Sequence, residues 1–198
     1  MNDDFLKINR IIGHTWGEPS EFISTPPYST ISYQAKNFRI SCQEERLQFD
    51  QVLSPGDWDI SELVEAASNY VGVLRHVQYI SIGVNAIFSG TTQTEGSEWI
   101  KSELLSESMV RRAGHVASAG IRLQLAIDPG SSLTIMVEPA PRGEGSSISE
   151  QESNQVQFQT NCHRTLSSGH PELIELIKST PEDLKKTKET IEKTVGVA

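Results

Sequence analysis

Two short segments of alternating apolar and polar residues, joined by a turn, constrain the fold more than any other feature of the sequence. Every second residue is apolar from 121 to 127 and again from 133 to 137. Successive side chains of a strand point to opposite faces, so a period of two is typical of a strand with one buried face. The connecting residues, Asp128-Pro129-Gly130-Ser131, are of the types that favour turns. The segment therefore predicts an antiparallel hairpin over 121–137.

The same alternation recurs in three other parts of the chain. Residues 30–52 alternate on both sides of a polar stretch and predict two or three antiparallel strands. The segment 79–88 alternates as well, but its second face is less polar than usual, which predicts a central strand covered at least in part on both sides. A last strand is expected over 156–162.

Helices are predicted between and after these strands. The spacing of apolar residues over 60–75 gives one apolar helical face, and Asp59 followed by Glu62 fits a capping box at its start. A second helix is expected in the middle of the chain. The C-terminal segment 171–198 predicts a short helix and then another helix with Thr180 as its N-cap.

The order of these elements predicts an α+β protein. Hairpin turns connect most strands and no strand–helix unit repeats, so we expect an antiparallel or mixed sheet of about six strands, with helices mainly on one face and further helices at the C-terminus. Residues 30–170 form the sheet domain in this interpretation, and 171–198 are its C-terminal helical segment. Residues 1–29 are interpreted as an N-terminal arm, because Gly17-Glu18-Pro19 and Pro26-Pro27 interrupt regular structure.

The charge of the chain restricts its partners. It has 17 basic and 26 acidic residues and a formal net charge of −9. Proteins that bind nucleic acid directly place clustered Lys and Arg on the phosphates, whereas the only adjacent basic pair before residue 171 is Arg111-Arg112. The acids are concentrated between Glu44 and Glu65, where only Arg46 opposes them. We therefore expect no direct nucleic-acid ligand, and the acidic segment is a surface that could attract a basic partner.

Residue types that carry catalysis or bind metals do not form a recognisable arrangement. Cys162-His163 are neighbours on a predicted strand, so their side chains point to opposite faces. Cys162 and Cys42 each share a face with apolar residues, as structural cysteines do. The five histidines have none of the spacings of a metal site. Asp57-Trp58-Asp59 offers two carboxylates, but Asp59 is better explained as a helix cap. We expect no catalytic residue, no metal, no cofactor and hence no enzyme.

The loop 89–97 is the best candidate for a small-molecule site. It lies between a predicted strand and a predicted helix, as anion-binding loops do. The lysine of a P-loop is absent, the two glycines are one residue too far apart, and Glu95 and Glu98 would repel a phosphate. A small-molecule-binding domain or an enzyme that uses this loop is therefore the alternative interpretation. Its candidate residues are Asn85, Gly90, Thr92, Gly96 and Ser97.

The favoured interpretation is a non-catalytic protein-interaction or assembly subunit of a larger bacterial-type complex. The sparse apolar stripe of the C-terminal helix, the apolar residues of the arm and strand edges that need covering all indicate a protein partner or a second copy of the chain. A nucleic-acid-associated role inside a larger complex is a third hypothesis. The candidate interaction residues are Glu44, Glu45, Asp57, Glu62, Arg111, Arg112, Leu184, Ile191 and Val195.

The sequence also predicts a location. No apolar run approaches the length of a membrane-spanning helix, so no membrane contact is expected. The first four residues are acidic where a targeting peptide would be basic, and two cysteines are too few for a disulfide framework. These features predict a cytoplasmic protein.

Overall fold

A computed structural model describes residues 1–54, 56–114, 116–141 and 154–195. The chain forms two compact units, each with a sheet and a hydrophobic core of its own. This division differs from the single sheet domain expected at 30–170. Unit 1 comprises Met1–Tyr79 and Ser167–Pro181, and unit 2 comprises Ile80–Leu166 and Glu182–Ala198.

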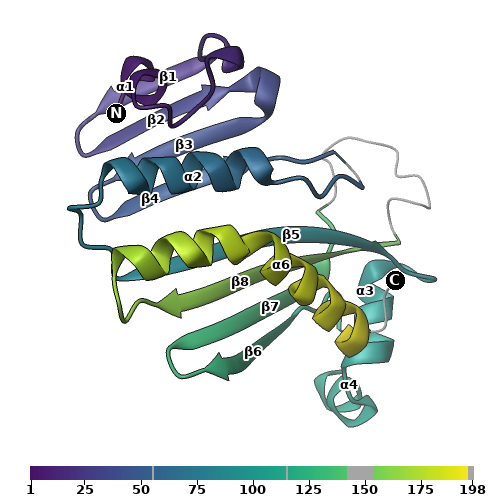
Figure 1. Cartoon of the computed structure of the whole chain (residues 1–198). Coiled ribbons are helices and arrows are strands. Elements are labelled where there is room, and N and C mark those ends of the chain that lie inside the picture. The colour runs from purple at the N-terminus through teal and green to yellow at the C-terminus, as the bar shows by residue number, and fades with distance from the viewer. Residues whose placement is uncertain (55, 115, 142–153, 196–198) are drawn as a thin grey trace. The chain divides into compact units, whose positions relative to one another are not determined.

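Unit 1 contains a four-stranded antiparallel sheet, here called sheet A. Each strand pairs with the next one along the chain, because the connections between them are tight turns or the short helix η2 (Gln34–Lys36) (Figure 1). The first of these strands, β1, was not predicted. The strands are β1 (Glu21–Thr25), β2 (Tyr28–Tyr33), β3 (Phe38–Gln43) and β4 (Arg46–Gln51).

One face of sheet A packs against α1 (Asp3–Ile8), η1 (His14–Trp16) and α2 (Ser61–Val73). Figure 1 shows α2 lying along this sheet. The cross-strand register places side chains of all four strands in one row on this face, and the helices contribute the opposite side of the core. The buried core residues are Leu6, Ile11, Ile12, Trp16, Ile31, Tyr33, Phe38, Ile40, Ala66 and Tyr70.

Helix α2 agrees with the helix predicted over 60–75. The capping box is not formed, because the Asp59 carboxylate accepts a hydrogen bond from the backbone N–H of Ser61 at 2.9 Å and not from that of Glu62. Hydrogen bonds from the Ser61 hydroxyl and backbone hold the pKa of Asp59 below its usual range.

Residues 1–29 fold as part of unit 1 and not as a separate arm. Four of their apolar side chains lie in its core, and residues 21–25 form the edge strand β1. The alternation rule misses this strand because its two apolar residues, Phe22 and Ile23, are adjacent and both exposed. The bend at Pro26-Pro27 is the turn between β1 and β2, not a break in the sheet.

Unit 2 contains a second four-stranded antiparallel sheet, here called sheet B, with the strand order β5-β8-β7-β6. The hairpin predicted over 121–137 is present as β6 and β7. The strand predicted as central, β5, is at an edge among the described residues, because only β8 pairs with it. Its face with Ser81, Gly83, Asn85 and Ile87, which was expected to be partly covered, is exposed. The strands are β5 (Ser81–Thr91), β6 (Ile121–Asp128), β7 (Ser131–Pro139) and β8 (Gln155–Thr165).

One face of sheet B carries the core of unit 2. This face packs against α3 (Gly96–Trp99), η3 (Ile100–Leu104) and the second half of α6 (His170–Val195). The intervening α4 (Glu107–Ala113) has no buried residue. The buried core residues are Ile100, Leu133, Ile135, Val137, Val156, Phe158, Cys162 and Ile191.

The C-terminal segment is one helix where two were predicted. Proline lacks a backbone N–H and usually ends or kinks a helix, but α6 continues through Pro181. The Thr180 hydroxyl donates to the Leu176 carbonyl at 3.1 Å, so Thr180 is a residue of the helix interior and not its N-cap. The division between the two units falls after Pro181.

The α+β class is confirmed, but the arrangement of the strands is not. Eight strands form two antiparallel four-stranded sheets within the described residues, where about six strands in one sheet were expected. Local alternation identifies strands but not their partners, and β5 pairs with a strand that lies more than sixty residues further along the chain. No helix in the described parts of the chain is long and apolar enough to cross a membrane.

Candidate protein-binding site

The strand β1 is an open edge of sheet A. It pairs with β2 on one side and, within the described residues, with no strand on the other. All five of its residues are exposed. An edge strand presents a row of backbone N–H and C=O groups to which another extended segment can bond. The strand β1 therefore offers a template for a fifth strand.

The hydrophobic core of unit 1 is incompletely covered at β1. Phe22, Ile31, Ile40 and Phe49 form one cross-strand row on the core face. Ile31 and Ile40 are completely buried beneath the helices, whereas the Phe22 side chain at the end of the row is 48% exposed. An apolar ring that continues a core row into solvent provides a place for a further apolar side chain.

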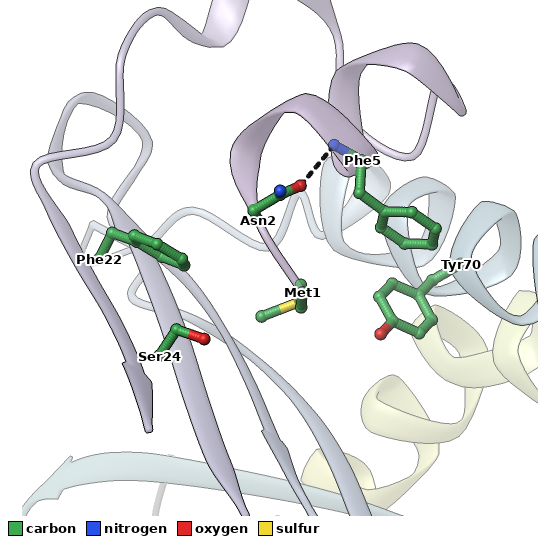
Figure 2. Close-up of a pocket in the computed structure, with 6 residues that line it drawn as sticks. All are labelled: Met1, Asn2, Phe5, Phe22, Ser24 and Tyr70. Atoms are coloured by element: carbon green, nitrogen blue, oxygen red, sulfur yellow. Dashed lines mark hydrogen bonds between the residues drawn. The ribbon is translucent and has the colours of Figure 1, made fainter. Parts of the chain in front are cut away.

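A pocket of about 510 Å³ opens beside the exposed Phe22 ring. Figure 2 shows Phe22 and Ser24 of β1 on one side, Phe5 and Tyr70 on the other, and Met1 between them. Three separate stretches of the chain thus supply its walls. The pocket is lined by Met1, Asn2, Phe5, Phe22, Ser24 and Tyr70.

Contacts around the pocket fix the wall opposite β1. The Asn2 side-chain oxygen accepts a hydrogen bond from the Phe5 backbone N–H at 2.9 Å and caps α1. The Phe5 and Tyr70 rings meet edge to face with centroids 6.0 Å apart, and Tyr70 contacts Phe49 in the same manner at 5.8 Å. Such pairs contribute about 0.5–1.5 kcal/mol beyond the area they bury. This wall is therefore preformed.

Burial raises the pKa of Tyr70 to about 12. The folded state favours the neutral phenol, so this contribution to stability is complete below the ordinary tyrosine pKa of about 10 and is lost as the pH rises through 12. In a titration of phenolate absorbance, Tyr70→Phe is expected to remove a step near pH 12. Loss of a step near pH 10 would contradict the buried position of Tyr70.

Acidic side chains lie near both ends of β1. Glu21 is the first residue of the strand and is exposed, and the Glu18 side chain is 89% exposed just before it. Glu44 and Glu45 are exposed on the turn between β3 and β4, where they line a second hollow together with Pro27 from the turn after β1. Two of the predicted interaction residues are thereby placed close to the candidate site.

The other acidic candidates lie elsewhere in unit 1. Asp57 is exposed in the segment before α2, where its carboxylate accepts a hydrogen bond from the Asp59 backbone N–H at 2.9 Å. Glu62 is half-buried and forms an ion pair with Lys36 at 2.5 Å. Both carboxylates of the Asp57-Trp58-Asp59 motif are engaged in local hydrogen bonds at the start of α2.

The remaining interaction candidates lie in unit 2. Arg111 and Arg112 are exposed on α4, where Arg112 donates to the Ser108 carbonyl at 3.1 Å. Leu184 is half-buried on α6, and Ile191 is buried in the core of this unit. The side chain of Val195 lies outside the described residues. The structure does not bring these residues together with β1 in one unit.

The residues proposed for a ligand in loop 89–97 already have contacts within unit 2. The Thr92 hydroxyl lies 2.7 Å from the Thr94 carbonyl and 3.0 Å from that of Asn154. The Ser97 hydroxyl donates to the Ala117 carbonyl at 3.4 Å, and Gly96 packs against the backbone of Gln155. Asn85 and Gly90 belong to β5, where the Asn85 side-chain oxygen Oδ1 accepts a hydrogen bond from the Asn161 side-chain Nδ2 at 2.6 Å. Ligand binding by this loop remains a prediction.

The cysteines and histidines, which could act as nucleophiles or metal ligands, lie at separate places in the fold. Cys162 is buried in the core of unit 2 and Cys42 is half-buried in β3. His163 is exposed on β8. His170 is the first residue of α6, and its ring Nε2 lies 3.0 Å from the Val71 carbonyl oxygen in α2. The described residues contain no group of three or more His, Cys, Asp and Glu side chains placed to hold a metal ion.

Comparisons of the chain with protein-family models, curated proteins and solved structures gave no match. The pocket lining was missed from the sequence because it comes from three separate stretches of the chain, around Phe5, Phe22 and Tyr70. The one available signal was the presence of apolar residues in the first 30 positions without a clear element to hold them.

Proposed function

We propose that the chain is a non-catalytic protein-binding module that takes up an extended segment of a partner protein along β1. The observation that carries this proposal is the open edge strand beside an apolar pocket: all five β1 residues are exposed, and two of them line the pocket. In strand addition, backbone hydrogen bonds supply affinity and pockets for alternate side chains supply specificity.

The geometry defines what the partner segment must look like. Phe22 and Ser24 lie on the same face of β1, so a segment paired with β1 points every second side chain toward the pocket. An apolar side chain suits the lining by Met1, Phe5 and Phe22. With five residues in β1, the paired part of the partner is short.

The charge near β1 favours a basic partner. Glu21, Glu44 and Glu45 are exposed near the two ends of the strand, with Arg46 beside the last two. Glu18 is also exposed there and pairs with Lys7 at 3.4 Å, and the whole chain carries a net charge of −9. Long-range attraction raises the association rate of an oppositely charged partner and weakens as salt screens it. The proposed partner is therefore an extended segment with alternating apolar residues and Lys or Arg at its ends.

The pocket lining also supports a binding role over a catalytic one. The polar side-chain groups that line it are the Asn2 amide and the hydroxyls of Ser24 and Tyr70. General acid–base catalysis at neutral pH needs a group whose pKa lies near the working pH, whereas the pKa of Tyr70 is raised to about 12. These groups can donate and accept hydrogen bonds to a bound backbone.

The proposal is tested with peptides selected from a display library of short alternating apolar and threonine sequences with lysine at both ends. Binding of a selected peptide is measured by calorimetry to the full chain and to two variants. Phe22→Asp is expected to weaken binding about tenfold or more, because it places a carboxylate in the apolar pocket; a tenfold loss corresponds to about 1.4 kcal/mol.

Ile23→Asp is the matched control. Ile23 is the next residue of β1 and is 40% exposed, but its side chain points to the opposite face of sheet A. It is expected to change the affinity by less than about threefold. A library without binders, equal effects of the two variants, or no effect of Phe22→Asp would contradict the proposal.

A further inference from the structure

The edge strand β5 of sheet B has a composition unlike that of an ordinary exposed edge. Its eleven residues, Ser81–Thr91, contain no charged side chain and no proline. All eleven pair with β8 on one side, and the strand order leaves the other side without a strand partner in the described parts of the chain. Its side chains are alternately half-buried and exposed along its whole length.

The edge strands β4 and β6 carry features that protect against strand pairing. Charged residues, shortness and bulges are the usual means of protection. The strand β6 contains Arg122 and Asp128 and an irregularity near its end, and β4 contains Arg46 and Asp50. A long, neutral edge without these features is the expected form of an edge that is covered by another strand.

We propose that two copies of the chain associate by antiparallel pairing of β5 with β5 of the second copy, which joins two copies of sheet B into one continuous sheet. This inference is independent of the partner site on β1. An antiparallel pair of identical strands is symmetric about a two-fold axis, so the same surface serves both copies. The register that pairs all eleven residues places Ala86 opposite Ala86 of the second copy.

This register pairs apolar side chains on the core face and places no like charges opposite each other on either face. It places Val84 opposite Phe88 of the second copy on the core face, where both residues are half-buried at the margin of the unit 2 core. On the other face it places Asn85 opposite Ile87 of the second copy, and Ile87 is 65% exposed in the single chain. Apolar cross-strand pairs stabilise a sheet, and like charges directly opposite destabilise it.

The absence of charged residues in β5 favours a second copy of the chain as its partner. The chain has a net charge of −9, so two copies repel each other at most surfaces. The strand β5 lets them meet without placing any like charges opposite each other. A basic partner would gain no charge complementarity from this strand, because it has no acidic residue.

The mass of the full chain in solution, measured by light scattering over a dilution series, tests the proposal. The expected mass is twice the 21.9 kDa of one chain. Asn85→Lys and Ile87→Glu are each expected to reduce it to that of one chain, because each places a charge at the pairing edge. The double variant Asn85→Lys with Ile87→Glu is expected to restore the dimer, since lysine then faces glutamate of the second copy twice.

Gln124→Lys is the matched control. Gln124 lies in the same cross-strand row as Asn85 and on the same face, but on the opposite edge strand β6. This variant is expected to remain a dimer. Asn85→Lys also removes the hydrogen bond with Asn161, whereas Ile87→Glu leaves it intact, so thermal unfolding of both variants separates misfolding from dissociation. A single-chain mass for the unmodified protein, a dimeric Ile87→Glu variant, or a monomeric double variant that is folded would overturn the proposal.

Discussion

Trp16→Ala is expected to lower the free energy of unfolding of unit 1 by about 3–5 kcal/mol, the usual cost of removing a large buried aromatic side chain. The Trp16 side chain is 7% exposed and contacts the rings of Tyr33 and Phe38 with centroids 5.4 and 4.7 Å apart. Its removal leaves a cavity between η1 and sheet A. Urea unfolding followed by circular dichroism measures the effect.

Ile8→Ala is the control for this prediction. Ile8 is an apolar residue of the same N-terminal segment, but it is 78% exposed at the end of α1. Its replacement is expected to change stability by no more than about 0.5 kcal/mol. If Trp16→Ala had an equally small effect, Trp16 would not be part of the core of unit 1.

Gly96→Ala is expected to destabilise unit 2 by about 1–3 kcal/mol, as overpacking usually does. A Cβ atom at this position would overlap the backbone carbonyl oxygen of Gln155 and would lie 3.2 Å from the Val156 side chain. Backbone atoms of β8 cannot move aside as a flexible side chain can. Thermal unfolding monitored by circular dichroism measures the loss.

Gly72→Ala is the control for this prediction, because the same substitution is expected to stabilise the protein at this position. Gly72 lies on an exposed side of α2, and a Cβ there meets no atom within 4 Å. Alanine favours a helix over glycine, so this variant is expected to be more stable by about 0.5 kcal/mol. A destabilisation by Gly72→Ala as large as that by Gly96→Ala would show that the close approach to β8 is not what requires glycine at position 96.

Much of the secondary structure could be predicted from local patterns. The apolar spacing that gave α2 is set by the 3.6-residue period of a helix, and the hairpin at 121–137 is set by a period of two and a turn with proline and glycine. Both patterns are read within a single segment. They were therefore available without knowledge of the partner segments.

Strand partners and exposure could not be predicted in the same way. Whether β5 is central or at an edge depends on β8, which is distant along the chain, and its neutral face resembles that of a covered strand. The segment Thr180–Asp183 was interpreted as a helix start because proline is common at the first position of a helix. The hydroxyl groups of Ser179 and Thr180 instead donate to the Leu176 carbonyl, and the helix continues through Pro181.

The candidate site was predicted only in part. The acidic segment pointed to Glu44 and Glu45, which lie near the turn after β1. The apolar pocket itself depends on the packing of α1 and α2 against sheet A, which no local pattern reports. An exposed aromatic residue such as Phe22 is uninformative in the sequence, and it becomes meaningful only because it ends a buried row of sheet A.

The most direct test of the protein-binding role is amide hydrogen exchange of the full chain with and without a selected peptide. Strand addition at β1 gives new partners to its free backbone N–H groups, so slower exchange is expected in residues 21–25. Exchange in the loop 89–97 is expected to stay unchanged. Slower exchange in that loop with none in residues 21–25 would contradict the account and favour a ligand site in unit 2.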